Sequence, residues 1–433
     1  MRFTSTRNPD LDVSFEQAVL DCMPSDGGLY VPADVSDLRK WIMYTGKNTS
    51  FASIAGALTL ACINEEFSPI ICETIATKAF PFEPVLKKLD KRFYFLELFH
   101  GPSGSHKDFG VSYLVSTLET LLQLSGKNAV FLDVTTGELG AILAKELRGM
   151  KHVKAVLLYP AGTVCGLNEK DYVWNGGNIY PFEVTGTESD CHDMVRKIFS
   201  DRKLVEKYHL TVANTANIGR LIPQSFFYPF AFSRLKDQVV GNIYYALSAG
   251  NYSNVVAGLY SWRLALPVNG FILPSTDTIK LDPLENCKIL DSFVPMAQRQ
   301  PADPADPSNI ERLEEVFAVN SAMVKNFIYP ADVSEPETEK VTKDLFVKYH
   351  LYVDKFTAAA YAAAVKRIDL CEPGDAMVVV ARDHPSFSKA YFQHCLGEFP
   401  EVPAEIAATR RKIALKRPLI STADDIIAVL KNL

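Results

Sequence analysis

Short apolar runs alternate with segments of helical periodicity between residue 91 and about residue 280, and no other feature constrains the fold as strongly. The runs are largely apolar along their length rather than apolar only at every second position, which is typical of strands that are covered on both faces. Repeated strand–helix units of this kind predict an α/β fold with parallel sheets. The predicted strands are 92–99, 129–134, 154–159, 179–184, 243–247 and 270–273, and the predicted helices are 111–122, 139–147, 190–199, 221–235 and 254–265.

The chain divides into three regions by pattern, and we expect these regions to be domains. Residues 1–90 are predicted to form a mainly helical N-terminal domain, with Ser14 at the start of its first helix. Residues 91–235 and 236–433 are each predicted to form an α/β lobe. Within the last lobe, the pattern predicts helices at 335–349, 357–368 and 386–394, a strand at 376–381, and an amphipathic tail from 400 to 433 that packs against the rest.

Lys107 stands where a predicted strand gives way to a predicted helix, within the segment FHGPSGSHKDFG at residues 99–110. A lysine near the start of a helix meets the positive end of the helix dipole, which favours the neutral amine. A neutral lysine is the nucleophile that forms a Schiff base with a carbonyl substrate or with pyridoxal phosphate. On residue type alone, a solvated surface lysine is the more frequent outcome, because lysines are mostly exposed.

Residues 99–110 resemble the cofactor-lysine segment of the threonine synthases. The N-terminal sequences at 3–7, 14–20 and 26–32 are similar to the same family, and the resemblance extends over nearly the whole chain. It implies the tryptophan-synthase-β fold, also called pyridoxal-phosphate fold type II, with two parallel-sheet lobes. It also implies that Lys107 binds pyridoxal 5'-phosphate covalently and transfers protons as the catalytic residue, and that the reaction converts O-phospho-L-homoserine and water to L-threonine and phosphate.

Residues 248–254 (SAGNYSN) follow a predicted strand and precede a predicted helix. Small residues at such a turn let backbone N–H groups close on a phosphate at the helix N-terminus. The alternative is an ordinary strand-to-helix turn with an Asn cap. The segment resembles the phosphate-binding loop of the threonine synthases, with Ala249 and Ser253 in place of Ser and Gly. By this resemblance the cofactor-binding residues are Lys107, Ala249, Gly250, Asn251, Tyr252, Ser253, Asn254 and Arg382.

Two further segments resemble the substrate-binding segments of that family. Residues 135–140 (TTGELG) are similar to its Thr-Ser-Gly-Asp-Thr-Gly loop, and residues 214–224 to its Asn-Ser-x-Asn-x-x-Arg-x-x-x-Gln segment. The alternative for the first is a strand-to-helix loop with Thr136 as N-cap. The alternative for the second is Asn217 as a helix cap and Arg220 as a salt-bridge partner. The implied substrate-binding residues are Thr135, Thr136, Gly137, Glu138, Asn217 and Arg220.

Several positions depart from the family pattern on the substrate side. Ala161 and Thr163 stand where related enzymes carry two cations, and Leu139 replaces a hydroxyl. Phosphate binds best to Arg and Lys, so we expect weak turnover of O-phosphohomoserine unless Arg220 and Lys170 compensate. Two alternatives therefore stay open: a related pyridoxal-phosphate lyase that acts on a different β- or γ-substituted amino acid, and a catalytically silent paralogue.

Arg382 marks a departure on the cofactor side. The family carries Gly-Thr-Ala-His-Pro where this chain has ARDHP, and the family's Thr lies by the pyridine nitrogen. A guanidinium only donates hydrogen bonds, so in that place it would keep the ring nitrogen unprotonated and weaken the cofactor as an electron sink. The alternative is that Arg382 turns away and pairs with Asp383 on the surface.

Composition excludes several classes of function. The net charge is −6 without a basic block, so no electrostatic case for nucleic acid exists. No uncharged apolar stretch approaches the ~20 residues of a membrane span, and the first residues lack the apolar run of a signal peptide. The 8 cysteines form no C-x-x-C pair, so neither zinc nor disulfides are expected. We expect no metal, a cytoplasmic monomer or homodimer, and a small amino-acid substrate as partner.

Overall fold

The computed structural model describes residues 1–63, 66–168, 171, 177–289 and 294–433. Its larger sheet has the strand order β13-β10-β9-β14-β4-β3. β13 (Ile328–Ala331), β10 (Gly270–Pro274), β9 (Ile243–Ala246), β14 (Ala376–Ala381) and β4 (Phe93–Glu97) run parallel, and β3 (Val85–Lys88) pairs antiparallel with β4 at the edge. Buried strand residues come mainly from continuous apolar runs such as AMVVVA in β14, as expected for a sheet covered on both faces.

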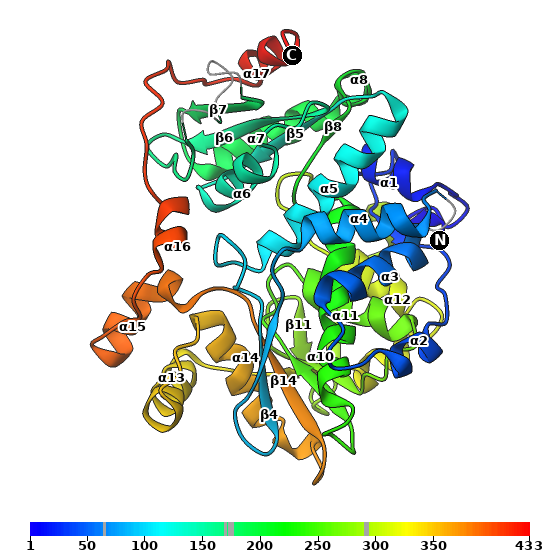
Figure 1. The fold of residues 1–433 in the computed structure, drawn as a ribbon, viewed down its shortest axis with the longest axis vertical. Helices are drawn as coiled ribbons and strands as arrows, with labels where there is room; N and C mark the ends of the chain where they lie inside the picture. Colours follow the sequence, from blue (N-terminus) through cyan, green and yellow to red (C-terminus); the bar gives the residue numbers. More distant parts are fainter. Residues whose placement is uncertain (64–65, 169–170, 172–176, 290–293) are drawn as a thin grey trace.

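The smaller sheet is parallel throughout, in the order β7-β6-β5-β8. Its strands are β7 (Ile179–Val184), β6 (Val153–Pro160), β5 (Ala129–Val134) and β8 (Leu210–Thr211). The expected α/β fold with two parallel-sheet lobes is therefore confirmed. Figure 1 shows the smaller sheet above the larger one, with α5 (Lys107–Ser125) running between them.

The larger sheet takes strands from both sides of the chain divisions at residues 90 and 235. As domain boundaries, these divisions stay a prediction. β4 precedes Lys107 in the chain but pairs with β14 in the larger sheet. At the other end of the chain, α17 (Ala423–Leu430) packs on the smaller sheet, where its residues Ala423, Ile426 and Leu430 join the buried cluster of β5 and β6. The expected packing of the tail is thus confirmed.

The N-terminal region contains four helices among its described residues, α1 (Phe15–Asp21), α2 (Arg39–Tyr44), α3 (Phe51–Ile63) and α4 (Pro69–Ala79). Ser14 caps α1 by accepting a hydrogen bond from the backbone N–H of Gln17, as predicted. β1 (Phe3–Ser5) and β2 (Tyr30–Pro32) form a small antiparallel pair in the same region.

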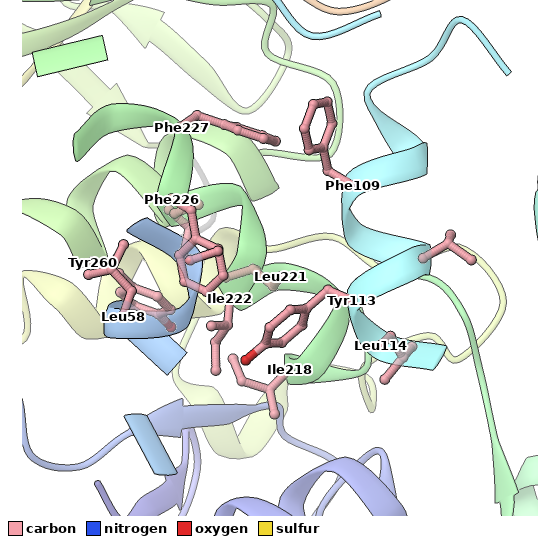
Figure 2. Close-up of a cluster of buried hydrophobic side chains, with 14 of the residues drawn as sticks. Leu58, Phe109, Tyr113, Leu114, Ile218, Leu221, Ile222, Phe226, Phe227 and Tyr260 are labelled. Atoms are coloured by element: carbon pink, nitrogen blue, oxygen red, sulfur yellow. The ribbon is translucent and has the colours of Figure 1, made fainter. Parts of the chain in front are cut away.

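The predicted helix at 221–235 is broken into three pieces. They are α9 (Ile218–Leu221), the 3-10 helix η3 (Ile222–Phe226) and α10 (Phe227–Leu235). Pro223 lies in the first turn of η3, and its missing N–H and fixed φ suit a new helical start better than a helix interior. Figure 2 shows that this broken segment packs against α5: Phe109 faces Phe227, and Tyr113 faces Ile222 and Phe226.

The remaining elements complete the layers around the sheets. The helices are α6 (Glu138–Glu146), α7 (Glu188–Ser200), α8 (Arg202–Tyr208), α11 (Ser253–Arg263), α12 (Ile310–Val316), α13 (Glu335–Tyr349), α14 (Lys355–Lys366), α15 (Lys389–Leu396) and α16 (Ala404–Thr409). Short 3-10 helices lie at η5 (Met296–Gln298), η6 (Ser321–Asn326), η7 (Ile368–Leu370) and η8 (Pro385–Ser388), and β11 (Ile279–Leu281) pairs with β12 (Cys287–Ile289). Within the described part of the chain, no helix combines the length and apolar character that a membrane span requires.

Candidate active site

A cavity of about 300 Å³ lies between the two sheets, beyond the carboxyl ends of their strands. The segments that follow β5, β8, β9 and β14 all reach it, which is where ligands bind in open parallel sheets. Most of the predicted site residues line this one cavity: Lys107, Thr135, Thr136, Glu138, Arg220, Ala249, Gly250, Asn251, Ser253, Asn254 and Arg382. Residues that are far apart in the sequence are therefore brought together as expected.

Lys107 is the first residue of α5, and its amine lies in the cavity wall. Its Nζ donates a hydrogen bond to Glu138 Oε2 at 2.7 Å, and the two side chains form an ion pair. Burial alone would raise the pKa of Glu138, but the positive charge of Lys107 holds that pKa below its usual value. The ion pair thus places both side chains together at the cavity wall.

Arg220 is buried and lines the same cavity as Lys107. Its Nε and Nη1 have no hydrogen-bond partner among the described residues. Burial lowers the pKa of Arg220 to about 10, against the opposing effect of Asp108, Glu138 and Asp133. The side chain therefore stays charged at neutral pH and offers two unpaired donors to an anion.

Residues 248–254 form a tight turn into the N-terminus of α11. Gly250 (φ 49°) and Tyr252 (φ 65°) both have left-handed backbone conformations. The N–H of Tyr252 donates to the carbonyl of Ala249, and the Tyr252 hydroxyl lies 2.7 Å from Thr276 Oγ1. The Tyr252 side chain is thus directed away from the cavity, although the turn that contains Tyr252 lines the cavity.

Thr135, rather than the Thr136 of the alternative interpretation, organises the start of α6. Its buried hydroxyl accepts hydrogen bonds from the N–H groups of Gly137 and Gly140 at 3.0 and 3.1 Å. Thr136 is exposed and lines the cavity. Gly137 is the N-cap with φ 136°, and a Cβ atom there would overlap the sulfur of Cys165. Gly137 therefore shapes the loop without lining the cavity.

Asn217 does not line the cavity, which corrects the expectation that it binds substrate together with Arg220. Its amide donates to the carbonyl of Val19 and to Thr211 Oγ1, and its Oδ1 accepts from the N–H of Gly219. These bonds use the side chain as the cap of α9. The predicted contribution of Lys170 lies outside the described residues, and the Thr163 hydroxyl donates to the carbonyl of Pro160.

Arg382 lines the cavity and does not turn to the surface. Its Nη1 donates to Ser248 Oγ at 3.1 Å, and its Nη2 lies 3.6 Å from Asp383 Oδ2. Burial alone would raise the pKa of Asp383, but hydrogen bonds from His106 and Ser105 and the charge of Arg382 hold that pKa well below its usual range. Arg382 is thus fixed between the turn after β9 and an ionised carboxylate.

Several cavity residues are not predicted by the sequence patterns. His106 lines the cavity, and its Nδ1 lies 3.2 Å from Asp383 Oδ1, to which Ser105 Oγ also donates at 2.6 Å. His106 and Ser248 lie inside residues 99–110 and 248–254, the two segments predicted to bind the cofactor. Their proximity in sequence to Lys107 and Gly250 is the feature that could have indicated them. Glu188, Ala213, Asn214, Thr215 and Gln224 also line the cavity.

The arrangement fits pyridoxal phosphate. An amine at the cavity wall, a glycine-containing turn into a helix N-terminus and unpaired guanidinium donors are the groups that an aldehyde and a phosphate require. Comparison with known proteins gives the same answer. Residues 73–383 match the family described as "Pyridoxal-phosphate dependent enzyme".

The chain belongs to this family. Residues 2–80 also match the family described as "Threonine synthase N terminus". Among curated proteins, the chain is 29% identical over 412 residues to a threonine synthase of Buchnera aphidicola subsp. Acyrthosiphon pisum, with 94% of each chain covered. It is 28% identical over 410 residues to a threonine synthase of Escherichia coli, again with 94% of each covered.

Solved structures agree over the whole chain. The crystal structure of threonine synthase from Escherichia coli superposes with a TM-score of 0.77 at 27% identity and covers 100% of this chain and 99% of its own. The structure of threonine synthase with pyridoxal phosphate bound, from Brucella melitensis, gives a TM-score of 0.81 at 19% identity, covering 100% and 99%. This second likeness concerns the fold alone.

Proposed function

We propose that this protein is a pyridoxal-phosphate-dependent lyase of the threonine synthase type, which converts O-phospho-L-homoserine and water to L-threonine and phosphate. The observation that carries the proposal is the convergence of Lys107, Arg220 and the turn at residues 248–254 on one cavity. A covalent anchor, an anion-binding arginine and a phosphate-binding turn are the parts that this reaction needs. The relatives named above support the choice of substrate.

Each part has a distinct role. Lys107 binds the cofactor covalently and, once the substrate amine has replaced it, moves protons at the substrate α and β carbons. The turn at residues 248–254 and the N-terminus of α11 bind the cofactor phosphate. When bound, the cofactor takes up the negative charge that develops on the substrate carbon.

Arg220 provides the anion-binding donors for the substrate. The positions 161 and 163 carry no cation in this chain, so the phosphate or the carboxylate of the substrate depends on the unpaired nitrogens of Arg220. Hydrogen bonds from a charged donor to a phosphate are short and strong. Thr135 fixes the loop at 135–140, where Thr136 and Glu138 line the cavity.

A second candidate keeps the cofactor but uses another β- or γ-substituted amino acid. Leu139 lines the cavity where the related loop carries a hydroxyl, and this observation favours a less polar or uncharged leaving group. In both cases we propose a cytoplasmic enzyme that acts as a monomer or homodimer on a small amino acid.

The proposal is tested by incubating the cofactor-loaded protein with O-phosphohomoserine and measuring threonine and phosphate together. Equal amounts of both products are expected, and the Lys107→Ala protein should be colourless and inactive. Phosphate or oxo-acid release from other substituted amino acids, without threonine from O-phosphohomoserine, would select the second candidate. A yellow Lys107→Ala protein with an unchanged spectrum would remove Lys107 from both.

A further inference from the structure

Arg312 in α12 has a fully buried guanidinium, and it is not among the described residues that line the cavity. Its Nε donates to the carbonyl of Tyr30 at 2.9 Å, and its Nη2 donates to the carbonyl of Ala216 at 3.0 Å. Its Nη1 donates to the carbonyl of Thr215 and, at 2.7 Å, to Asn309 Oδ1. Because a buried charge needs such bonds, Arg312 holds these backbone segments and the Asn309 side chain in fixed positions.

The contact with Arg312 decides which way the amide of Asn309 faces. A guanidinium only donates hydrogen bonds, so the atom that faces it is the amide oxygen. The amide nitrogen of Asn309 donates instead to Thr215 Oγ1 at 3.0 Å and to the carbonyl of Asn251 at 3.1 Å. Asn309 is fully buried, and its backbone N–H donates to the same carbonyl of Asn251 at 3.0 Å. Its side chain is therefore a fixed donor toward Thr215.

A second fixed donor meets the same hydroxyl oxygen. Asn251 Nδ2 donates to Thr215 Oγ1 at 2.8 Å and to the carbonyl of Pro307 at 3.1 Å. Asn251 Oδ1 accepts from the backbone N–H of Ser253 at 3.3 Å. A carbonyl only accepts and a backbone N–H only donates, so these two neighbours leave the amide nitrogen of Asn251 facing Thr215.

Thr215 Oγ1 thus accepts two hydrogen bonds. A hydroxyl oxygen has two lone pairs and one O–H, so two accepted bonds leave only the hydrogen for a third partner. No described residue accepts a hydrogen bond from this hydroxyl, and Thr215 lines the cavity although it is largely buried. Buried O–H groups ordinarily have an acceptor. The cavity is the place from which a ligand can supply one.

We propose that Asn309 is a positioning residue, which Arg312 holds so that the Thr215 hydroxyl donates into the cavity to an anionic oxygen of the substrate. The proposal rests on the proposed function, since it takes the cavity as the binding site of a phosphorylated amino acid. Arg220, from the same segment as Thr215, brings unpaired donors to this cavity. A hydroxyl that accepts two bonds is polarised toward donation, and an anionic oxygen is the acceptor that forms the stronger bond.

The products of the proposed reaction separate the two anionic groups of the substrate, because L-threonine carries the carboxylate and inorganic phosphate carries the phosphate. Calorimetric titration of the cofactor-loaded protein with each product alone gives two dissociation constants without turnover. Asn309→Asp keeps the side-chain shape but replaces the donor by an acceptor, so the Thr215 hydroxyl should turn toward residue 309 and away from the cavity. We expect at least about tenfold weaker binding of the product whose anionic group Thr215 binds.

Thr215→Val removes the hydroxyl and should weaken the same product to a similar extent. In the Thr215→Val protein, Asn309→Asp should then change the dissociation constant by less than about twofold, because both substitutions remove the same donor. An equal effect of Asn309→Asp with and without the Thr215 hydroxyl would show that the new charge acts by itself, and would overturn the proposal. Unchanged binding of both products in Asn309→Asp would overturn it as well.

Asn178→Asp is the matched control, because Asn178 does not line the cavity and its Nδ2 donates to the carbonyls of Leu147, Met150 and Val153. This substitution deletes the same kind of donor elsewhere and should leave both dissociation constants within about twofold of the unaltered values. Equal weakening in Asn178→Asp and Asn309→Asp would reduce the effect to general destabilisation and contradict the proposal.

Turnover of O-phosphohomoserine by the unaltered protein tests the proposed function separately. Absence of threonine there ends the proposed function itself. Threonine formation together with unchanged product binding in Asn309→Asp ends the role of Asn309 alone.

Discussion

A Cβ atom on Gly110 would overlap Nη1 of Arg220, so the first turn of α5 and the guanidinium fit together only because residue 110 has no side chain. Gly110 lies one turn after Lys107 in α5. The arginine therefore reaches the cavity through space that a glycine leaves open inside a helix, at a position where glycine is otherwise unfavourable.

Gly110→Ala should displace Arg220 and weaken substrate binding while the cofactor stays bound. A charged hydrogen bond is worth roughly 1.5–3 kcal/mol, so we expect KM for O-phosphohomoserine to rise at least about tenfold. Steady-state kinetics measures the effect, and the absorbance spectrum reports cofactor occupancy. Gly46→Ala is the control, since a Cβ atom there meets open space. A KM within twofold of the unaltered value would count against the role of Arg220.

Gly250→Val should weaken the affinity for pyridoxal phosphate by at least tenfold, ~1.4 kcal/mol. Gly250 has φ 49°, which a β-branched residue adopts only with strain, and its turn shapes the proposed phosphate site. Equilibrium titration of the cofactor-free protein measures the change. Gly126→Val introduces a similar strain at φ 67° at the end of α5, far along the helix from Lys107, and should keep the affinity. Unchanged affinity in Gly250→Val would remove this turn from the phosphate site.

Arg382 should face the ring nitrogen of the bound cofactor. Because a guanidinium cannot accept a hydrogen bond, we expect the ring nitrogen to stay unprotonated and threonine formation, with its successive carbanions, to be slower than simple elimination. Arg382→Thr should therefore raise the ratio of threonine to oxo acid, whereas Arg382→Lys should not. A cofactor-bound structure with a hydroxyl, a carboxylate or water at the ring nitrogen would contradict this expectation.

Asp133 should make the protein less stable as the pH rises from about 4 to about 7. Burial raises the pKa of Asp133 to about 7, although its carboxylate accepts hydrogen bonds from the N–H of Ala213. The folded protein thus binds a proton that the unfolded chain has lost above pH ~4, and this stabilisation disappears as the pH approaches 7. Asp133→Asn should reduce this pH-dependent loss in the free energy of unfolding by about 2–4 kcal/mol.

Unfolding midpoints in urea at pH 4.5 and pH 7.5 provide the measurement. Asp34→Asn, at an exposed position, is the control and should keep the pH dependence of the unaltered protein. An identical pH dependence in Asp133→Asn would show that the buried carboxyl is not the source.

Local sequence patterns were sufficient to predict the α/β class, the strands with long apolar runs and the position of Lys107 at a helix start. β5, β7 and β14 have the predicted bounds, because a largely apolar run between turns has few alternatives in a buried sheet. The segments around Lys107, Gly250 and Arg382 are predicted to share one site because ligands bind where parallel strands end.

Which of the predicted site residues face the cavity depends on tertiary packing. Asn217 and Arg220 are three residues apart in the sequence. Asn217 caps a helix and makes its hydrogen bonds inside the protein, whereas Arg220 has unpaired donors. The pairing of Lys107 with Glu138 and the place of β4 beside β14 depend on contacts between distant parts of the chain. Local sequence patterns indicate which residues are buried. Contacts between residues that are distant in the sequence depend on the space and charge that other segments of the folded chain provide.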